Sequence, residues 1–203
     1  MKSLRKLFVL APVMLMSLTA CEAKIDEAKA KERVNAYDSA KVAEKYESCD
    51  VTMKVDVKKN TGAFAEGGSM YMLVSLMKNA GEDGEQKGQP AEEYVYTSEM
   101  FETLMTSFSA VSGETKNAEV TYYSYKSNGL KISGSAKLDQ EYQGAKMSGS
   151  VKAELYVLDD GRVEKEKATL NLKISGGETE EVKKTNGELN LSLSASVKWN
   201  AKK

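Results

Sequence analysis

The chain has 203 residues, and its 29 basic and 30 acidic side chains nearly cancel. Nucleic-acid binders present a basic face, and no stretch of this chain concentrates basic residues, so the composition excludes that class. The absence of histidine excludes Ser-His-Asp and Cys-His nucleophilic sites and histidine-ligated zinc, and it removes the usual general base near neutral pH. We therefore expect no enzyme activity, no metal and no cofactor, since nothing marks a facing pair of carboxylates for glycoside chemistry.

The first 20 residues have the layout of a secretory signal. Lys2, Arg5 and Lys6 stand at the start without an acid, and an apolar run follows over residues 7–18. This run falls well short of the roughly 20 residues that span a bilayer as a helix. We therefore predict a signal peptide over residues 1–20 that is removed.

The cleavage region ends in Leu18-Thr19-Ala20-Cys21. This stretch resembles the lipobox of bacterial lipoproteins, a leucine and two small residues before a cysteine. The resemblance implies cleavage before Cys21 and attachment of acyl chains to it. Two or three acyl chains on one residue hold a protein firmly on a membrane, whereas a single chain binds only marginally.

The lipobox resemblance implies a lipid-anchored protein of the cell envelope that faces the extracytoplasmic side. Its partner would be the membrane, through the acyl chains on Cys21. The alternative is an ordinary secretory signal with an incidental cysteine, in which case Cys21 could pair with Cys49. With Cys21 acylated, Cys49 is expected to be a small buried apolar residue rather than a nucleophile.

The segment 22–47 is rich in Ala, Lys and Glu and contains neither Gly nor Pro, which favours a helix. Its first half offers no apolar stripe, because the large apolar side chains scatter around the circumference. Toward its end four apolar residues share a face: Val42, Ala43, Tyr46 and Cys49. We predict a lipid-anchored helical spacer over residues 21–38 and a single β-rich domain over residues 39–203.

The next segments carry weaker patterns. Apolar and polar residues alternate over residues 51–58, which predicts a half-buried strand followed by a turn. Residues 70–77 are nearly continuously apolar, and we favour a strand that pairs back on the first, with a helix as the alternative. Residues 78–93 contain no large apolar side chain, and we predict a mobile loop there.

The clearest helix pattern covers residues 98–111. Its apolar side chains form one stripe: Met100, Phe101, Leu104, Met105, Phe108 and Val111. Thr97 or Ser98 is suited to cap the start. Such a stripe must lie against apolar surface. We favour a helix that covers the sheet, and the alternative is a deformable lid over a lipid.

The second half of the chain is a run of strands joined by turn signals such as Asn128-Gly129. The last strand has the clearest apolar face: Leu189, Leu191, Leu193, Ala195, Val197 and Trp199. These patterns predict an α+β fold, in which an N-terminal helix precedes a curved antiparallel sheet of about seven strands. One or two helices pack on this half-barrel-like sheet.

Two helices are too narrow to cover seven strands, since strands lie about 4.8 Å apart and a helix is about 10 Å across. Either the sheet curls around the helices or an apolar groove stays open. Five small inward-facing residues would make room for a ligand, although they equally suit tight packing: Gly134, Ala136, Gly149, Ala153 and Ala195. The candidate groove residues are Met100, Phe101, Leu104, Met105, Phe108, Leu191, Leu193, Val197 and Trp199.

The order and patterning of the elements over residues 32–199 resemble bacterial half-barrel lipoproteins and periplasmic lipoprotein carriers. The resemblance includes no signature motif, so it assigns no functional residue. It implies binding or transfer of a lipid or a lipoprotein acyl chain. The alternative is a structural or protein-interaction envelope lipoprotein with a fully packed core. Five tyrosines would then form either an exposed patch or, as we favour, cross-strand packing pairs: Tyr94, Tyr96, Tyr122, Tyr123 and Tyr125.

Overall fold

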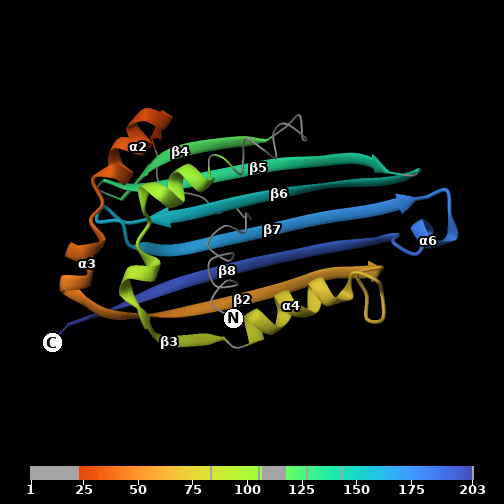
Figure 1. The fold of residues 1–203 in the computed structure, drawn as a ribbon, viewed down its shortest axis with the longest axis horizontal. Helices are drawn as coiled ribbons and strands as arrows, with labels where there is room; N and C mark the ends of the chain where they lie inside the picture. Colours follow the sequence, from red (N-terminus) through yellow and green to blue (C-terminus); the bar gives the residue numbers. More distant parts are fainter. Residues whose placement is uncertain are drawn as a thin grey trace.

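The computed structural model describes residues 23–82, 84–104, 106, 118–126, 128–142 and 144–202. The described residues form an α+β fold built on one antiparallel sheet of eight strands (Figure 1). The predicted α+β class and antiparallel sheet are therefore confirmed, with eight strands in place of about seven. The predicted signal peptide and Cys21 lie outside the described residues, as do Met105 and Phe108 of the predicted groove.

The sheet has the strand order β1-β4-β5-β6-β7-β8-β2-β3, so β1 and β3 are its edges. The strands are β1 (Lys24–Ile25), β2 (Tyr46–Gly62), β3 (Glu85–Pro90), β4 (Glu119–Tyr125), β5 (Gly129–Tyr142), β6 (Ala145–Val157), β7 (Val163–Gly176) and β8 (Gly187–Ala201). The helical segments are α2 (Glu27–Asn35), α3 (Ser39–Lys45), α4 (Tyr71–Glu82), the 3-10 helix η1 (Ala91–Tyr94), residues 98–104 and α6 (Glu180–Lys183).

Strict alternation gives the sheet one apolar and one polar face. Across β5, β6 and β7, for example, Ala136 lies opposite Val151, which lies opposite Leu170. We call this the inner face. The outer face carries the intervening polar residues, such as Lys152 and Thr169. The sequence pattern of the second half therefore predicted the orientation of these strands correctly.

The segment predicted as one long helix is two helices. The Asp26 carboxylate accepts a hydrogen bond from the Lys29 N–H at 2.7 Å and caps α2. Asp38 caps α3 in the same way through the N–H groups of Ala40 and Lys41. An N-cap residue is itself extended, so the chain turns at Asp38 and starts a new helix. Neither cap was recognised in the sequence.

The helix α2 differs from the solvated spacer that we predicted. Ala30 and Val34 are buried against the inner face of the sheet, because the helix lies on β4 and β5. After α3 the chain enters β2 at once, so Cys49 lies in a strand rather than at a helix end. Cys49 is fully buried, as expected, and its thiol is free.

The strand favoured over residues 70–77 is wrong, since residues 71–77 belong to the helix α4, as in the alternative. A short apolar run is ambiguous in sequence, and Met and Leu have high helix propensity. Val74 is fully buried, whereas Met72 is 73% exposed and Leu76 is 52% exposed. The continuous apolar run therefore supplies one packed face and one exposed face of a helix.

The loop predicted over residues 78–93 is also wrong. After α4, strand β3 pairs with β2, and η1 follows. An edge strand needs backbone hydrogen bonds rather than a buried face, which explains its polar sequence. The Asp50 carboxylate supports the pairing by accepting a hydrogen bond from the Gly88 N–H at 3.0 Å.

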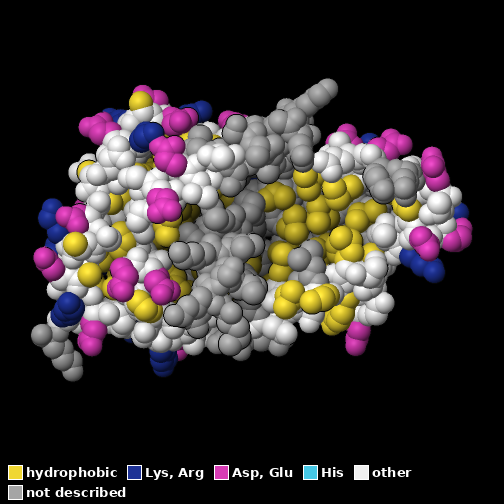
Figure 2. All heavy atoms as spheres, viewed as in Figure 1, with side chains coloured by type: hydrophobic (Ala, Val, Ile, Leu, Met, Phe, Trp, Pro, Cys, Tyr) yellow, Lys and Arg dark blue, Asp and Glu magenta, His cyan; other side chains and the backbone are white. Residues whose placement is uncertain are grey.

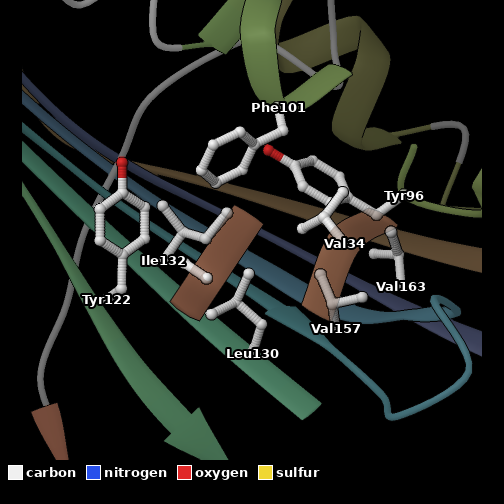
Figure 3. Packing of buried hydrophobic residues seen from close by; sticks show 9 residues of the cluster. Val34, Tyr96, Phe101, Tyr122, Leu130, Ile132, Val157 and Val163 are labelled. Atoms are coloured by element: carbon white, nitrogen blue, oxygen red, sulfur yellow. The ribbon is translucent and has the colours of Figure 1, made fainter. Parts of the chain in front are cut away.

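Two apolar clusters lie on the inner face, one toward each end of the strands. The first cluster consists of Ala30, Val34, Tyr96, Phe101, Tyr122, Leu130, Ile132, Val157 and Val163 (Figure 3). The second cluster consists of Phe64, Val74, Leu189 and Leu191. The helices α2 and 98–104 cover the first cluster, and α4 covers part of the second.

Gly161, in the turn before β7, lies close to Tyr37, which packs against the first cluster. Gly161 has φ +93°, and a Cβ atom there would lie 2.7 Å from the Cβ of Tyr37. Position 161 therefore requires glycine for two reasons: the backbone has a positive φ, and the Tyr37 side chain leaves no room for a Cβ atom. The contact ties the segment between α2 and α3 to the start of β7.

Candidate functional site

The inner face remains partly exposed around the second cluster. Apolar side chains on β5, β6 and β7 are only half-buried there: Leu138, Met147, Val151, Leu170, Leu172 and Ile174. In Figure 2 hydrophobic side chains gather to the right of centre, between α4 and the strands β5 and β6. An apolar area of this kind on a sheet face is a candidate ligand site.

The candidate residues on the 98–104 helix lie at the first cluster. Phe101 is 1% exposed, and its ring packs on that of Tyr122 with 5.8 Å between the centroids. Met100 and Leu104 are partly buried against the same cluster. The Met100 N–H donates to Thr97 Oγ1 at 3.3 Å, so Thr97 caps this helix. This part of the helix covers the sheet, as favoured from the sequence.

The four candidate residues on β8 do not form one site. Leu191 belongs to the second cluster, whereas Val197 packs against the first. Leu193 lies between them and is partly exposed. Trp199 lies at the end of the strand, where its Nε1–H donates to the Val163 carbonyl oxygen at 2.9 Å.

Trp199 belongs to an aromatic corner rather than to a groove. Its ring meets Tyr46 edge-on with 5.6 Å between the centroids, and the guanidinium of Arg162 lies 4.3 Å from the centre of the Tyr46 ring. These cation–π and edge contacts hold the ends of β2, β7 and β8 together. Trp199 therefore has a structural role in the described fold.

Small side chains lie in the middle of the inner face. Gly134, Ala153 and Ala168 form a register row across β5, β6 and β7, and Ala195 lies in the adjacent row on β8. Three of the five small residues predicted to face inward lie here, whereas Ala136 and Gly149 lie nearer the second cluster. Along the strands this row lies between Ile132 of the first cluster and Leu170, which packs against the second.

Glu166 is an acidic residue on the apolar inner face, and it is not among the site residues predicted from the sequence. It lies in register between Leu155 of β6 and Ala195 of β8. Burial raises the pKa of its carboxyl group to about 8. The period-two series Ala168, Leu170, Leu172 and Ile174, extended back by one step, reaches Glu166 and would have placed it on this face.

Tyr96 places a polar hydroxyl in the first cluster. Its side chain is 2% exposed, and no described residue makes a hydrogen bond to its hydroxyl. The Tyr96 N–H donates to the Gly161 carbonyl oxygen at 2.8 Å, which places the residue beside the start of β7. Burial raises the pKa of the hydroxyl above its ordinary value, and the nearby Tyr122 and Glu166 raise it further.

The tyrosines do not form the exposed patch considered as an alternative. Tyr96 and Tyr122 are buried in the first cluster. On the outer face Tyr125 meets Tyr156 edge-on with 5.0 Å between the ring centroids. The Lys165 ammonium lies 4.3 Å from the centre of the Tyr156 ring. Tyr125 therefore packs on a strand residue, as favoured from the sequence, whereas Tyr122 packs on Phe101 of a helix and Tyr96 lies outside the strands.

The described residues offer no arrangement for metal binding or thiol chemistry. No group of three or more His, Cys, Asp or Glu side chains is placed among them to hold a metal ion. Burial raises the pKa of the Cys49 thiol to about 12, so this cysteine stays protonated. Within the same residues no helix has both the length and the apolar character needed to cross a membrane.

Comparison with known protein families, with characterised protein sequences and with solved structures finds no match to this chain.

Proposed function

We propose that the protein is a membrane-anchored lipoprotein of the extracytoplasmic side that binds a lipid on the inner face of its sheet. The observation that carries this proposal is the half-buried apolar surface of Leu170, Leu172 and Ile174 on β7 and their neighbours on β5 and β6. Soluble proteins rarely leave a contiguous apolar face of this kind without a binding partner.

The shape of the face suits an elongated apolar ligand. Long strands run side by side beneath it, and α4 borders it along one side. Helix α4 contributes Val74 and Met77 to the adjoining second cluster. A flexible acyl chain would lie along the strands and contact side chains from several of them. Such binding needs no metal and no proton transfer.

The binding test uses a chain that begins at residue 22, because this chain retains every described element. The protein is purified from bacteria without detergent and extracted with organic solvent, and mass spectrometry quantifies the lipid. We expect about one lipid per protein. The Leu172→Asn variant should lose most of it, because a polar amide in the apolar face costs desolvation energy.

Met72→Asn is the matched control, because Met72 is 73% exposed on α4. It should fold like the parent chain and keep its lipid. Far-UV circular dichroism and a thermal melt confirm that both variants are folded. Absence of lipid from the parent chain, with no uptake of a fluorescent fatty acid, would contradict the proposal. That result would leave a packed interaction lipoprotein.

A further inference from the structure

Glu166 is exceptional on the inner face of the sheet because its neighbours there are apolar. Leu155 and Ala195 flank it across the strands, and Ala168 is the next residue on the same face of β7. No described residue gives its carboxyl group a hydrogen bond or an ion pair. A carboxyl group in such surroundings costs stability unless something bonds to it.

Burial alone raises the pKa of Glu166, and the charged groups of the elements around the first cluster are engaged elsewhere. On α2, Arg33 donates to Ser124 Oγ at 3.0 Å and to the Gly129 carbonyl oxygen at 2.7 Å. At the start of β7, Arg162 pairs with Asp160 at 2.8 Å. Two further groups, Lys31 and Glu102, pair with each other at the surface.

The charged neighbours within β7 itself point to the opposite face. Glu164 accepts a hydrogen bond from the Tyr125 hydroxyl, and Lys165 packs on the Tyr156 ring. No cation among the described residues therefore compensates Glu166. Because burial raises its pKa to about 8, the carboxyl group is mostly protonated at neutral pH and is then a hydrogen-bond donor.

Tyr96 supplies an independent second donor. Its hydroxyl is buried and bonded to no described residue, and Figure 3 shows the oxygen directed into the first cluster toward Phe101. The effect of Glu166 on the pKa of Tyr96 shows that the two groups lie within electrostatic range of each other. Glu166 and Tyr96 thus place two neutral O–H groups without acceptors in one apolar region, where the buried Tyr37 hydroxyl also has no partner among the described residues.

The same face of β7 continues from Glu166 as an apolar track. Leu170, Leu172 and Ile174 follow on this face. The eight residue-to-residue steps from Glu166 to Ile174 span about 26 Å of strand. An acyl chain reaches across about half of the roughly 30 Å hydrocarbon core of a bilayer. The track is therefore long enough for one acyl chain with its polar end at Glu166.

We propose that Glu166 and Tyr96 bind the carbonyl oxygen of an uncharged fatty-acid ester whose acyl chain lies along the inner face of β7. This inference rests on the proposed lipid-binding function and specifies the chemistry of the ligand. Two O–H donors match the two lone pairs of one carbonyl oxygen. The absence of a compensating cation among the described residues disfavours a ligand that ends in a carboxylate.

The test compares three ligands of equal chain length with the chain that begins at residue 22. Methyl palmitate carries the ester, hexadecane has no polar group, and hexadecylamine ends in a cation. Rapid gel filtration and mass spectrometry measure the bound amount at pH 6, 7 and 9. At pH 6 and 7 we expect a preference for the ester over the alkane of about tenfold to thirtyfold. The preference should shrink at pH 9, where Glu166 loses its donor proton.

The variants separate hydrogen bonding from packing. Glu166→Gln keeps an N–H donor of the same shape, so it should retain the ester preference and lose its pH dependence. Glu166→Leu should bind ester and alkane equally, and Tyr96→Phe should lose part of the preference. Glu164→Gln alters the outer face two residues away and should behave like the parent chain. Thermal melts confirm the folding of each variant.

The possible failures are distinguishable. Binding of all three ligands without an ester preference, or an ester preference that survives in Glu166→Leu, would overturn the inference and leave the proposed function intact. Stronger binding of hexadecylamine than of the ester would mean that Glu166 binds cations, which also overturns the inference. If none of the three ligands binds, both the inference and the proposed function fail.

Discussion

Glu166 links the chemistry of the inner face to the stability of the fold. In the unfolded chain its carboxyl group titrates near its ordinary pKa of 4.5, and in the folded protein burial raises this pKa to about 8. Between these two values the folded state holds a proton that the unfolded state has lost. The free energy of unfolding therefore falls as pH rises from about 5 to 8 and then levels off.

Glu166→Gln should remove this part of the pH dependence, because glutamine does not titrate. The free energy of unfolding of the variant, relative to that of the parent chain, should rise by a few kcal/mol between pH 5 and pH 9. This corresponds to about 1.4 kcal/mol per unit of pKa shift. Urea unfolding at pH 5, 7 and 9 measures the difference. A difference that does not change with pH would show that Glu166 has an ordinary pKa in the folded protein.

Sequence reasoning located the face of the sheet but missed its polar residue. The alternation that placed Leu170, Leu172 and Ile174 on one face is a strong signal because the side-chain period of a strand is two. The same period also places Glu166 on the inner face. In a sequence, however, an acidic residue at the start of an apolar series is easily taken to mark the end of the buried part of the strand. Tyr96 has no such periodic signal, because it follows the 3-10 helix η1.

At the scale of elements, α4 shows why an apolar run alone does not determine structure. Val74 contacts Phe64 and the β8 leucines of the second cluster, whereas Met72 faces away. Val74→Ala should lower the free energy of unfolding by about 2 kcal/mol, because it leaves a cavity between helix and sheet. Met72→Ala should change it by less than about 0.5 kcal/mol. Urea unfolding of both variants tests the prediction, and equal effects would contradict this orientation of α4.

The elements that the sequence did not predict depend on their neighbours. Strand β3 has no apolar face, and it exists because the edge of β2 offers backbone hydrogen bonds and the Asp50 carboxylate. Helix α2 has a mostly polar circumference, yet its two small apolar residues Ala30 and Val34 are enough to pack it on β4 and β5. Local hydrophobic patterns predict elements that have an apolar face of their own. They fail for elements such as β3 and α2, which are stabilised by backbone pairing with a neighbouring strand or by packing of a few small side chains on the sheet.

At the scale of the whole molecule, β8 joins the two halves of the chain. It pairs with β7 on one side and with β2 on the other, so the C-terminal strand completes the sheet that the N-terminal part begins. The apolar inner face thus forms from strands that lie far apart in the sequence. Such long-range pairing is typical of slowly folding sheets.

The proposed membrane anchor predicts the behaviour of the full chain in a bacterial cell. Labelling with an alkyne fatty acid should tag the wild-type chain and place it in the membrane fraction. Cys21→Ala should abolish the label and release the protein from the membranes, because the acyl chains supply the attachment. Cys49→Ala is the matched control, because this thiol is buried in β2, and it should keep the label. A tagged Cys21→Ala chain, or an untagged wild type, would contradict the anchor.

The aromatic corner at the end of β8 gives the molecule an optical reporter. Trp199 is the single tryptophan of the sequence, and its indole N–H is bonded to the backbone at the start of β7. Ala195, which lies opposite Glu166, is four residues away along the strand, a separation of about 13 Å. The intrinsic fluorescence of the unlabelled protein therefore follows the separation of β7 from β8 as the sheet opens, from a position outside the proposed acyl-chain track.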